Sequence, residues 1–336
     1  MSVGAAVAAI MFVGIIAYTI FGGADFGSGL WDLTAGDAAR GAKLRTLIDH
    51  SIGPVWEANH IWLIFVLVYL WTGFPAAFAA ICETLFVPLS LAGLGIVARG
   101  SAFAFRKFAP AVAQARLFGA LFALSSIVTP FLFGTIVGAV ASGRVPLDGT
   151  GDRWSSWTST TSLIGGVLAV ATTSFLAAVF LTREAQRTGD DELYGRCRKR
   201  ALGSGAVTGV LSLIAVAPLH ADAPHLFRHL NGRALPLLLV AVLAGTTAIV
   251  TVWTNRADVA RVAAVAAVGA VVAGWGVAQY PWVLVDTARI EDVAGNDATM
   301  WGLVVVFLIA GVTVVPALVW MLWLTQRPAW AADPSD

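Results

Sequence analysis

Residues 3–26 read VGAAVAAIMFVGIIAYTIFGGADF and contain one charged residue, Asp25, close to their end. An α-helix needs about 20 predominantly apolar residues to cross the hydrocarbon core of a bilayer, and this run is long enough. It lacks the charged n-region and the small-residue cleavage site of a secretory signal, so we expect a permanent membrane span. The run decides the fold class because the rest of the chain repeats its character.

The composition of the whole chain points the same way. Of 336 residues, 58% are hydrophobic and only 12% are charged, and the mean hydropathy is +0.81. A soluble domain is about 45–50% apolar and about 25% charged, and disordered chains are poorer still in apolar residues, so both classes are excluded. The net charge of +1 gives no indication of a nucleic-acid partner. Two cysteines, Cys82 and Cys197, do not predict a disulfide framework.

Apolar runs of spanning length recur along the chain, and they predict an all-α integral membrane protein. The runs are continuous, whereas a β-barrel would show segments of about ten alternating residues. We therefore expect a single multi-spanning membrane domain over residues 1–336. Its roughly nine helices are expected at residues 3–26, 54–74, 76–98, 117–141, 160–182, 202–219, 234–254, 259–280 and 300–325. The sixth run is short enough to be tilted or partly re-entrant.

Basic residues are distributed unevenly between the two sides of this predicted bundle. Of the 21 lysines and arginines, 16 follow the first, third, fifth and seventh runs or lie in the C-terminal tail. Positively charged loops face the cytoplasm, so we expect the N-terminus outside and the C-terminus in the cytoplasm. Residues 183–200 form the most highly charged segment, which we interpret as a solvated cytoplasmic loop that anchors the topology.

Charged side chains at membrane depth are costly and usually functional, which makes them the candidate site. Asp25 ends the first span, and Glu57 and His60 lie one turn apart on one face at the start of the second. The two carboxylates are expected at the same depth on the cytoplasmic side, where they would form a proton relay. The structural alternative is that they pair with Arg99, which ends the third span, or cap helices. Glu83, within the third span, has no assigned role.

Other cofactor chemistry has little support in the sequence. Haem ligation needs histidine or methionine ligands, and His60 is the one histidine at membrane depth, so we expect no haem or metal bound by this chain alone. His225 and His229 have an i, i+4 spacing that can bind zinc, but a solvated outer loop is the favoured interpretation. The sequence contains no Gly-rich phosphate loop, Cys-x-x-Cys pair or Ser/His/Asp arrangement.

Four stretches occur in a characteristic order: GGADFG at 22–27, IGPVWEANHIWL at 52–63, LWTGFP at 70–75 and GIVARGSAFAFR at 95–106. Together they resemble subunit II of the bacterial cytochrome bd-type quinol oxidases. The motifs cover the first third of the chain, and the remainder resembles the family only in its length and its number of helices.

The resemblance implies a place in an enzyme complex. It implies two four-helix bundles plus one peripheral helix, with the first bundle at about 1–141 and the second bundle and last helix at about 160–325. Subunit I of that family carries haems b and d, oxidises quinol and reduces oxygen to water, whereas subunit II holds no haem and supports assembly. The chain would then form a heterodimer with subunit I, multi-pass in the bacterial cell membrane and surrounded by lipid.

The resemblance also implies roles for individual residues. Protons are expected to reach the oxygen-reducing haem from the cytoplasm partly through subunit II. Asp25 and Glu57 match the acidic relay of the family, beside His60, and Arg99 matches a basic residue at its edge. Trp62 matches a tryptophan at the mouth of a lateral oxygen tunnel.

Two other functions remain open at this point. A secondary transporter would have helices broken near the membrane midplane, and Pro130, Pro218 and the short sixth span favour it. No cluster of polar residues accompanies either proline, which argues against it. The third possibility is a purely structural assembly subunit without proton or oxygen traffic.

Overall fold

The computed structural model describes residues 2–52, 56–106, 108–109 and 111–325, and most of these are helical. The long helices are α1 (Val3–Leu33), α3 (Trp56–Gly73), α5 (Phe86–Arg106), α6 (Val112–Ala141), α7 (Thr160–Thr188), α8 (Asp191–Asp222), α10 (Leu235–Trp253), α11 (Ala257–Gln279) and α13 (Asp297–Thr325). Within the described ranges, eight helices are long and apolar enough to cross a membrane. The count rises to nine if α2 (Ala38–Ile52) and α3, which are bent by 53°, form one span. The prediction of a helical protein with about nine membrane spans is therefore confirmed for the helix content and the number of candidate spans.

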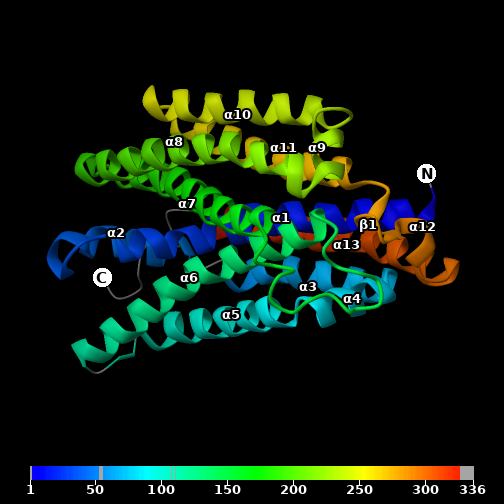
Figure 1. Cartoon of the computed structure of the whole chain (residues 1–336). Coiled ribbons are helices and arrows are strands. Elements are labelled where there is room, and N and C mark those ends of the chain that lie inside the picture. The colour runs from blue at the N-terminus through cyan, green and yellow to red at the C-terminus, as the bar shows by residue number, and fades with distance from the viewer. Residues whose placement is uncertain (1, 53–55, 107, 110, 326–336) are drawn as a thin grey trace.

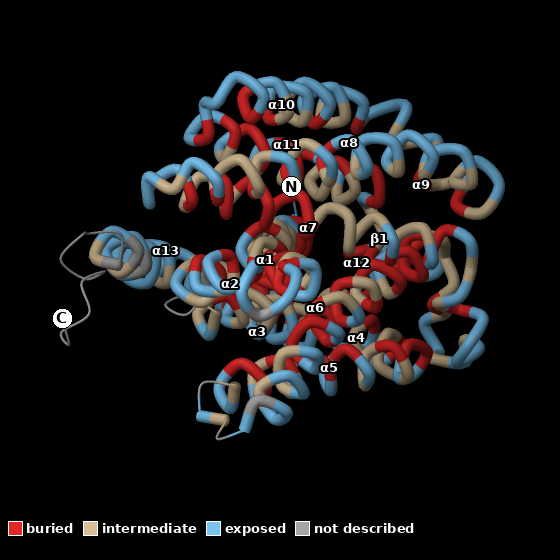
Figure 2. Tube along the Cα trace, turned by 90° about the vertical axis from the view of Figure 1, so that its left-hand side faces the viewer, coloured by how far each residue is buried: buried red, intermediate tan, exposed pale blue. Residues whose placement is uncertain are grey.

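The long helices lie roughly side by side, and α1 runs through the middle of the molecule (Figure 1). It packs against α3 and α6 on one side and against α7 and α11 on the other. Helix α13 touches α1 and α3, and Figure 2 shows that most of it is exposed. The division into two bundles at about residues 141 and 160 stays a prediction.

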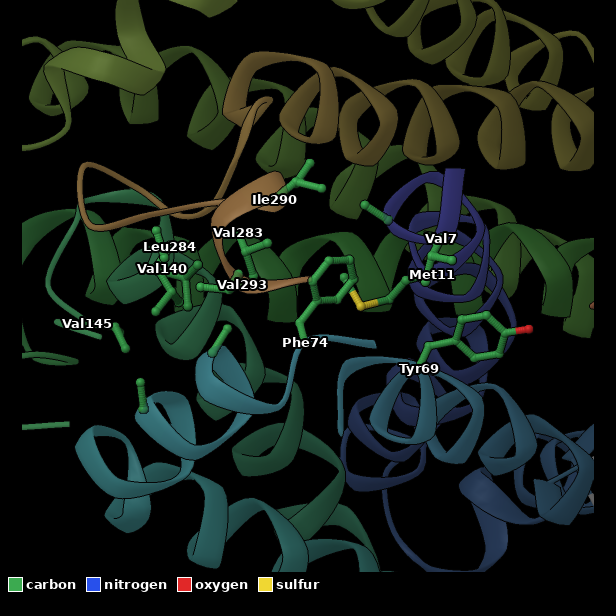
Figure 3. Close-up of a cluster of buried hydrophobic side chains, with 14 of the residues drawn as sticks. Val7, Met11, Tyr69, Phe74, Val140, Val145, Val283, Leu284, Ile290 and Val293 are labelled. Carbon is green, nitrogen blue, oxygen red and sulfur yellow. The ribbon is translucent and has the colours of Figure 1, made fainter. Parts of the chain in front are cut away.

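Short elements gather at the end of the bundle where the N-terminus lies (Figure 1). They are α4 (Pro75–Thr84), α9 (Pro224–Leu230), α12 (Ile290–Val293) and an antiparallel hairpin of β1 (Trp282–Leu284) and β2 (Ala288–Arg289). Figure 3 shows apolar side chains of the hairpin and α12 meeting α1 and α3 in one buried cluster, with Phe74 near its centre, and α4 adds Ala77 and Ala80 to it. Burial of such side chains stabilises a fold by about 1.5–3 kcal/mol each, so this cluster fixes the hairpin to the bundle.

Glycines allow the closest helix crossings. A Cβ atom at Gly27 of α1 would collide with the backbone carbonyl of Thr173 in α7. A Cβ atom at Gly134 of α6 would collide with the backbone of Gly165, also in α7. Small residues let helix backbones approach in this way. Helix α7 is therefore held directly against both α1 and α6, which fixes the position of the polar groups that α1 carries.

The helix boundaries differ from the sequence prediction in three places. Helix α1 continues to Leu33, beyond the predicted end at residue 26. An apolar run marks only the part of a helix that lies in the hydrocarbon core, and a helix can continue beyond it. The predicted third span at 76–98 is broken at Leu85, and α5 starts at Phe86. Pro88 explains the break, because proline lacks an N–H and its ring clashes with the carbonyl four residues earlier. The sixth span is not short: α8 runs over 32 residues, from Asp191 to Asp222.

The charged segment 183–200 is not a solvated loop, which corrects the sequence interpretation. It forms the end of α7 and the start of α8, separated by Gly189 and Asp190. Arg198 of α8 donates hydrogen bonds to the carbonyls of Val252 and Trp253 at the end of α10, at 3.0 and 2.6 Å. Helix ends leave such carbonyls without partners, and a cation there is favourable.

The same segment also caps α1. Arg200 donates to the carbonyl of Thr34 at 2.9 Å, and Arg196 donates to the carbonyl of Ala35 at 3.2 Å. The arginines of α8 therefore hold the ends of two other helices in place, in addition to marking the basic side of the protein.

Candidate functional site

Asp25 and Arg99 form a bidentate ion pair between α1 and α5. The two Nη atoms of Arg99 lie 2.6 and 3.1 Å from the carboxylate oxygens, and both side chains are only 2% exposed. The sequence prediction placed Arg99 at the end of its span, but α5 continues for two more turns, to Arg106. The structure therefore brings two of the predicted site residues together. Their pairing is the alternative to a proton relay that the sequence analysis named.

The surroundings of Arg99 complete its coordination. Its Nε atom donates to the hydroxyl of Ser126 in α6 at 2.9 Å. Its guanidinium carbon lies 4.9 Å from the ring centre of Phe26 and 4.8 Å from that of Phe122. Hydrogen bonds and aromatic faces offset part of the cost of burying the charge. The pair thus connects α1, α5 and α6.

A second ion pair repeats the first one closer to the end of the bundle where α2 lies. Arg106 donates to Asp32 at 2.8 Å, and the two residues are separated by 74 positions, as Asp25 and Arg99 are. Arg106 also contacts Asp49 of α2 at 3.3 Å. The sequence analysis missed this group. Asp32 and Arg106 follow Asp25 and Arg99 by seven residues, a spacing of about two helical turns that keeps side chains on one face, and that repeat was the available signal.

His60 lies close to the ion pair without joining it, and Glu57 lies one turn before His60 on α3. Glu57 is exposed in the first turn of α3, and no hydrogen bond or ion pair holds it within the described part of the chain. The ring of His60 is half-buried between Tyr18 and Phe26 of α1, with ring centres 6.1 and 6.0 Å away. Glu57 therefore faces outward one turn from His60, whereas Asp25 faces inward. Residues 53–55 of the quoted motif lie outside the described residues.

Trp62 belongs to an aromatic cluster on the surface between α1 and α3. Its ring stacks on Phe21 with a centre distance of 6.4 Å and meets Phe65 edge-on at 6.2 Å. Trp62 is half-buried, and Phe21 is 37% exposed. The indole is therefore partly exposed on the surface between α1 and α3.

Glu83 lies near the end of α4 and is exposed beside Gly149 in the segment that connects α6 to α7. It is not inside a spanning helix, because the predicted third span is broken at Leu85. It takes no part in the site around Asp25.

His225 and His229 pack against each other at the end of the bundle where the N-terminus lies. Their ring centres are 4.3 Å apart, and the Nδ1 atom of His225 is 3.8 Å from Asp286 in the hairpin. Burial and the neighbouring His229 ring lower the pKa of His225. Among the described residues, no group of three His, Cys, Asp or Glu side chains could hold a metal ion.

A haem does not fit the residues around His60. Haem iron needs an axial ligand beside an open face for the macrocycle. The ring of His60 is enclosed between two aromatic rings of α1. The chemistry available to this part of the chain is therefore the positioning of charge and the transfer of protons.

The fold and the site define a polytopic helical membrane protein with a charged cluster between its first helices. Residues 4–325 match the family model described as "Cytochrome bd terminal oxidase subunit II". The chain belongs to this family, whose members are components of a quinol oxidase complex.

Individual relatives agree with that assignment. The chain is 26% identical to "Cytochrome bd ubiquinol oxidase subunit 2" of Bacillus subtilis over 245 residues, which cover 72% of this chain and 69% of the relative. It is 20% identical to the "Putative cytochrome bd menaquinol oxidase subunit II" of the same organism, over 63% of this chain and 61% of that relative. The solved bd oxidase of Geobacillus thermodenitrificans shares the fold, with a TM-score of 0.80, 22% identity and coverage of 97% and 99% of the two chains.

Proposed function

We propose that this chain is the haemless subunit II of a bacterial cytochrome bd-type quinol oxidase, located in the cell membrane with its N-terminus outside. In this role it stabilises a partner, subunit I, which holds haems b and d and transfers electrons from quinol to oxygen. It also contributes to proton uptake from the cytoplasm and to oxygen access. The observation that carries the proposal is the position of Glu57 on the outer face of α3, because family membership alone does not assign a task to any residue.

The face of α3 that carries Glu57 is otherwise apolar. Ile61, Ile64, Val68 and Trp71 are between 44% and 64% exposed, and they follow Glu57 at helical spacing. A carboxylate beside such a surface is costly against lipid, so a protein partner is the better neighbour. Helix α13 lies alongside α3 and exposes most of its length. We place subunit I on this combined surface of α3 and α13.

Proton transfer through Glu57 follows from the same placement. A relay acid must gain and lose a proton, and a carboxylate without an ion-pair partner can do so at a smaller cost than one held by an arginine. Glu57 has no such partner in the described structure, whereas Asp25 is held by Arg99. Glu57 and His60 are therefore the proton carriers, and Asp25 with Arg99 supplies the fixed charge next to them.

Oxygen access is assigned to the cluster around Trp62. Oxygen is more soluble in lipid than in water, and this cluster is partly exposed on the surface between α1 and α3. The indole therefore lines an opening through which oxygen reaches the partner.

The transporter alternative is not favoured. It depended on helices interrupted at Pro130 and Pro218, but α6 and α8 continue through both prolines. The short sixth span that also suggested it is a full-length helix.

The first test is purification of the chain from native membranes. We expect a haem-bearing partner to co-purify, with the absorbance of b- and d-type haems, and we expect the chain alone to be unstable or to aggregate. A stable, monodisperse chain without such a partner would contradict the proposal.

The second test is Glu57→Gln, which keeps the shape and removes the titratable group. We expect the oxidase to keep its haems and to lose turnover and proton uptake by at least about tenfold, because positioned acids contribute about 10²–10⁴ to such steps. Glu83→Gln is the matched control, because Glu83 is also exposed but lies near the end of α4, beyond the far end of α3. Equal turnover in the two variants would leave only the assembly role.

A further inference from the structure

A pocket opens beside the β1–β2 hairpin, at the end of the bundle where the N-terminus lies (Figure 1). It has a volume of about 190 Å³ and is lined by Ala5, Tyr280, Pro281, Arg289, Ile290 and Glu291. These residues come from the start of α1, the segment after α11, strand β2 and α12. Pockets for drug-sized ligands measure about 300–1,000 Å³, so this pocket admits a small polar group and not a large ligand.

The walls of this pocket are fixed by backbone and apolar contacts. The amide of Ile290 donates a hydrogen bond to the carbonyl of Pro281 at 2.8 Å, which joins α12 to the segment after α11. The side chain of Ile290 is 5% exposed and packs on α1, where a Cβ atom at Gly4 would lie 3.4 Å from it. The pocket is therefore formed before any ligand enters it, as binding sites for small groups usually are.

Two opposite charges line the pocket without pairing. The side chains of Arg289 and Glu291 are exposed, and within the described part of the chain no hydrogen bond or ion pair holds either of them. The guanidinium carbon of Arg289 lies 5.0 Å from the ring centre of Trp282, a cation–π contact that orients the guanidinium. A guanidinium matches the oxygens of a phosphate, and a carboxylate accepts hydrogen bonds from an ammonium group. A ligand that carries both a phosphate and an ammonium group would therefore satisfy both side chains.

The pocket lies at the level where two candidate membrane spans end. Helix α11 ends at Gln279, and Ala5 lies in the first turn of α1. Tyr280 is 48% exposed, and tyrosine is enriched at the depth of the lipid headgroups. Val13 follows Ala5 by eight residues on α1 and is 48% exposed, and Val277 precedes Tyr280 by three residues and is 38% exposed. Helical spacing places each valine on the same side as the pocket residue of its helix, so apolar surface for acyl chains adjoins the pocket.

We infer that this pocket binds the headgroup of phosphatidylethanolamine, with the phosphate on Arg289, the ammonium on Glu291 and the acyl chains along α1 and α11. Phosphatidylglycerol has the phosphate but no cation for Glu291. The quaternary ammonium of phosphatidylcholine has no N–H group to donate to the carboxylate. Phosphatidylethanolamine is thus the phospholipid that engages both charges of the pocket by hydrogen bonds.

Lipid retention by the purified complex tests the site. The complex is washed in detergent, incubated with an equimolar mixture of phosphatidylethanolamine, phosphatidylglycerol and phosphatidylcholine with the same acyl chains, and washed again. Mass spectrometry then counts each lipid per complex. We expect phosphatidylethanolamine to exceed the other two by at least about threefold, a modest factor because exposed charge pairs contribute little each. Arg289→Gln should remove this excess, and Glu291→Gln should make the retention of phosphatidylethanolamine and phosphatidylglycerol equal.

Arg153→Gln is the matched control, because Arg153 is also exposed but lies in the segment between α6 and α7 and does not line the pocket. It should keep the excess of phosphatidylethanolamine. Equal retention of the three lipids by the unaltered complex would overturn the inference, and so would an equal loss in Arg153→Gln and Arg289→Gln. If Arg289→Gln does not assemble, Glu291→Gln decides alone, and an unchanged lipid preference in it would overturn the site. The readout does not depend on turnover, so its failure leaves the proposed function standing.

Discussion

Arg99 holds both carboxylate oxygens of Asp25 from a helix that lies 74 residues further along the chain. Arg106 holds Asp32 across the same separation. Two ion pairs at equal spacing fix the register of α1 against α5, because a shift of one residue would break both. Helix α1 also packs closely on α7 through Gly27. The position of α1 is therefore fixed both by the ion pairs with α5 and by the close contact with α7.

Because Asp25 is in a buried ion pair and Glu57 is not, we expect Asp25→Asn to affect the stability of the complex and Glu57→Gln to affect only its turnover. Removing one partner of a buried ion pair costs about 3–5 kcal/mol, because the other charge is left without compensation. We therefore expect Asp25→Asn to lower the thermal stability of the complex and its haem retention, besides lowering turnover. Glu57 is exposed, so Glu57→Gln should change turnover but not stability.

The control for this prediction is the double variant Asp25→Asn with Arg99→Gln. It removes both charges and should recover part of the lost stability, as measured by thermal unfolding of the purified complex. If Asp25→Asn alone is as stable as the unaltered oxidase, the pair does not clamp the helices.

The sequence predicts the spans and the charged residues well because both depend on the cost of polar groups in lipid, which is a local property. It identifies Asp25 and Arg99 but gives their contact only as an alternative to a proton relay, because a pairing over 74 residues depends on how the helices pack. Helix α2 and the arginines of α8 were missed for a different reason. Their residues are polar enough for water, so hydropathy cannot distinguish an interfacial helix or a helix cap from a loop.

The aromatic cluster gives a prediction about oxygen. Trp62→Ala removes the ring that stacks on Phe21, which should clear a path between α1 and α3, so the apparent KM for oxygen should fall with unchanged haem content. Trp253→Ala is the control, because Trp253 is 68% exposed at the end of α10, which packs on α8, α9 and α11 and not on the Trp62 cluster. Identical oxygen kinetics in the unaltered oxidase and Trp62→Ala would exclude a tunnel at this position.

The crossing of α1 and α7 gives a prediction about assembly. Gly27→Ala places a methyl group against the Thr173 carbonyl, and overpacking of this kind costs about 1–3 kcal/mol or more. We expect less assembled oxidase in the membrane and a lower unfolding temperature. Gly203→Ala in α8 is the control, because nothing lies within 4 Å of the added atom. Equal yields of the two variants would mean that α1 and α7 can separate without cost.

His225 gives a prediction about pH at the end of the bundle where the N-terminus lies. Its pKa is lowered from the ordinary value of 6.5, first by burial and then by His229, and the positive charges of Arg233 and Arg228 act in the same direction, whereas Asp286 opposes them. Because the unfolded chain takes up the proton at a higher pH than the folded one, the stabilisation is complete above about pH 6.5 and is lost as the pH falls through the folded value.

The contact of α9 with the β1–β2 hairpin should therefore loosen in acid. Hydrogen-exchange protection of residues 282–289, corrected for intrinsic rates, should be lower at about pH 5 than at about pH 8, the range in which histidine changes its charge. His225→Gln cannot be protonated, so it should keep the same protection at both pH values. An equal acid loss of protection in that variant would assign the effect to another group, and the buried imidazole would then have no part in holding the hairpin.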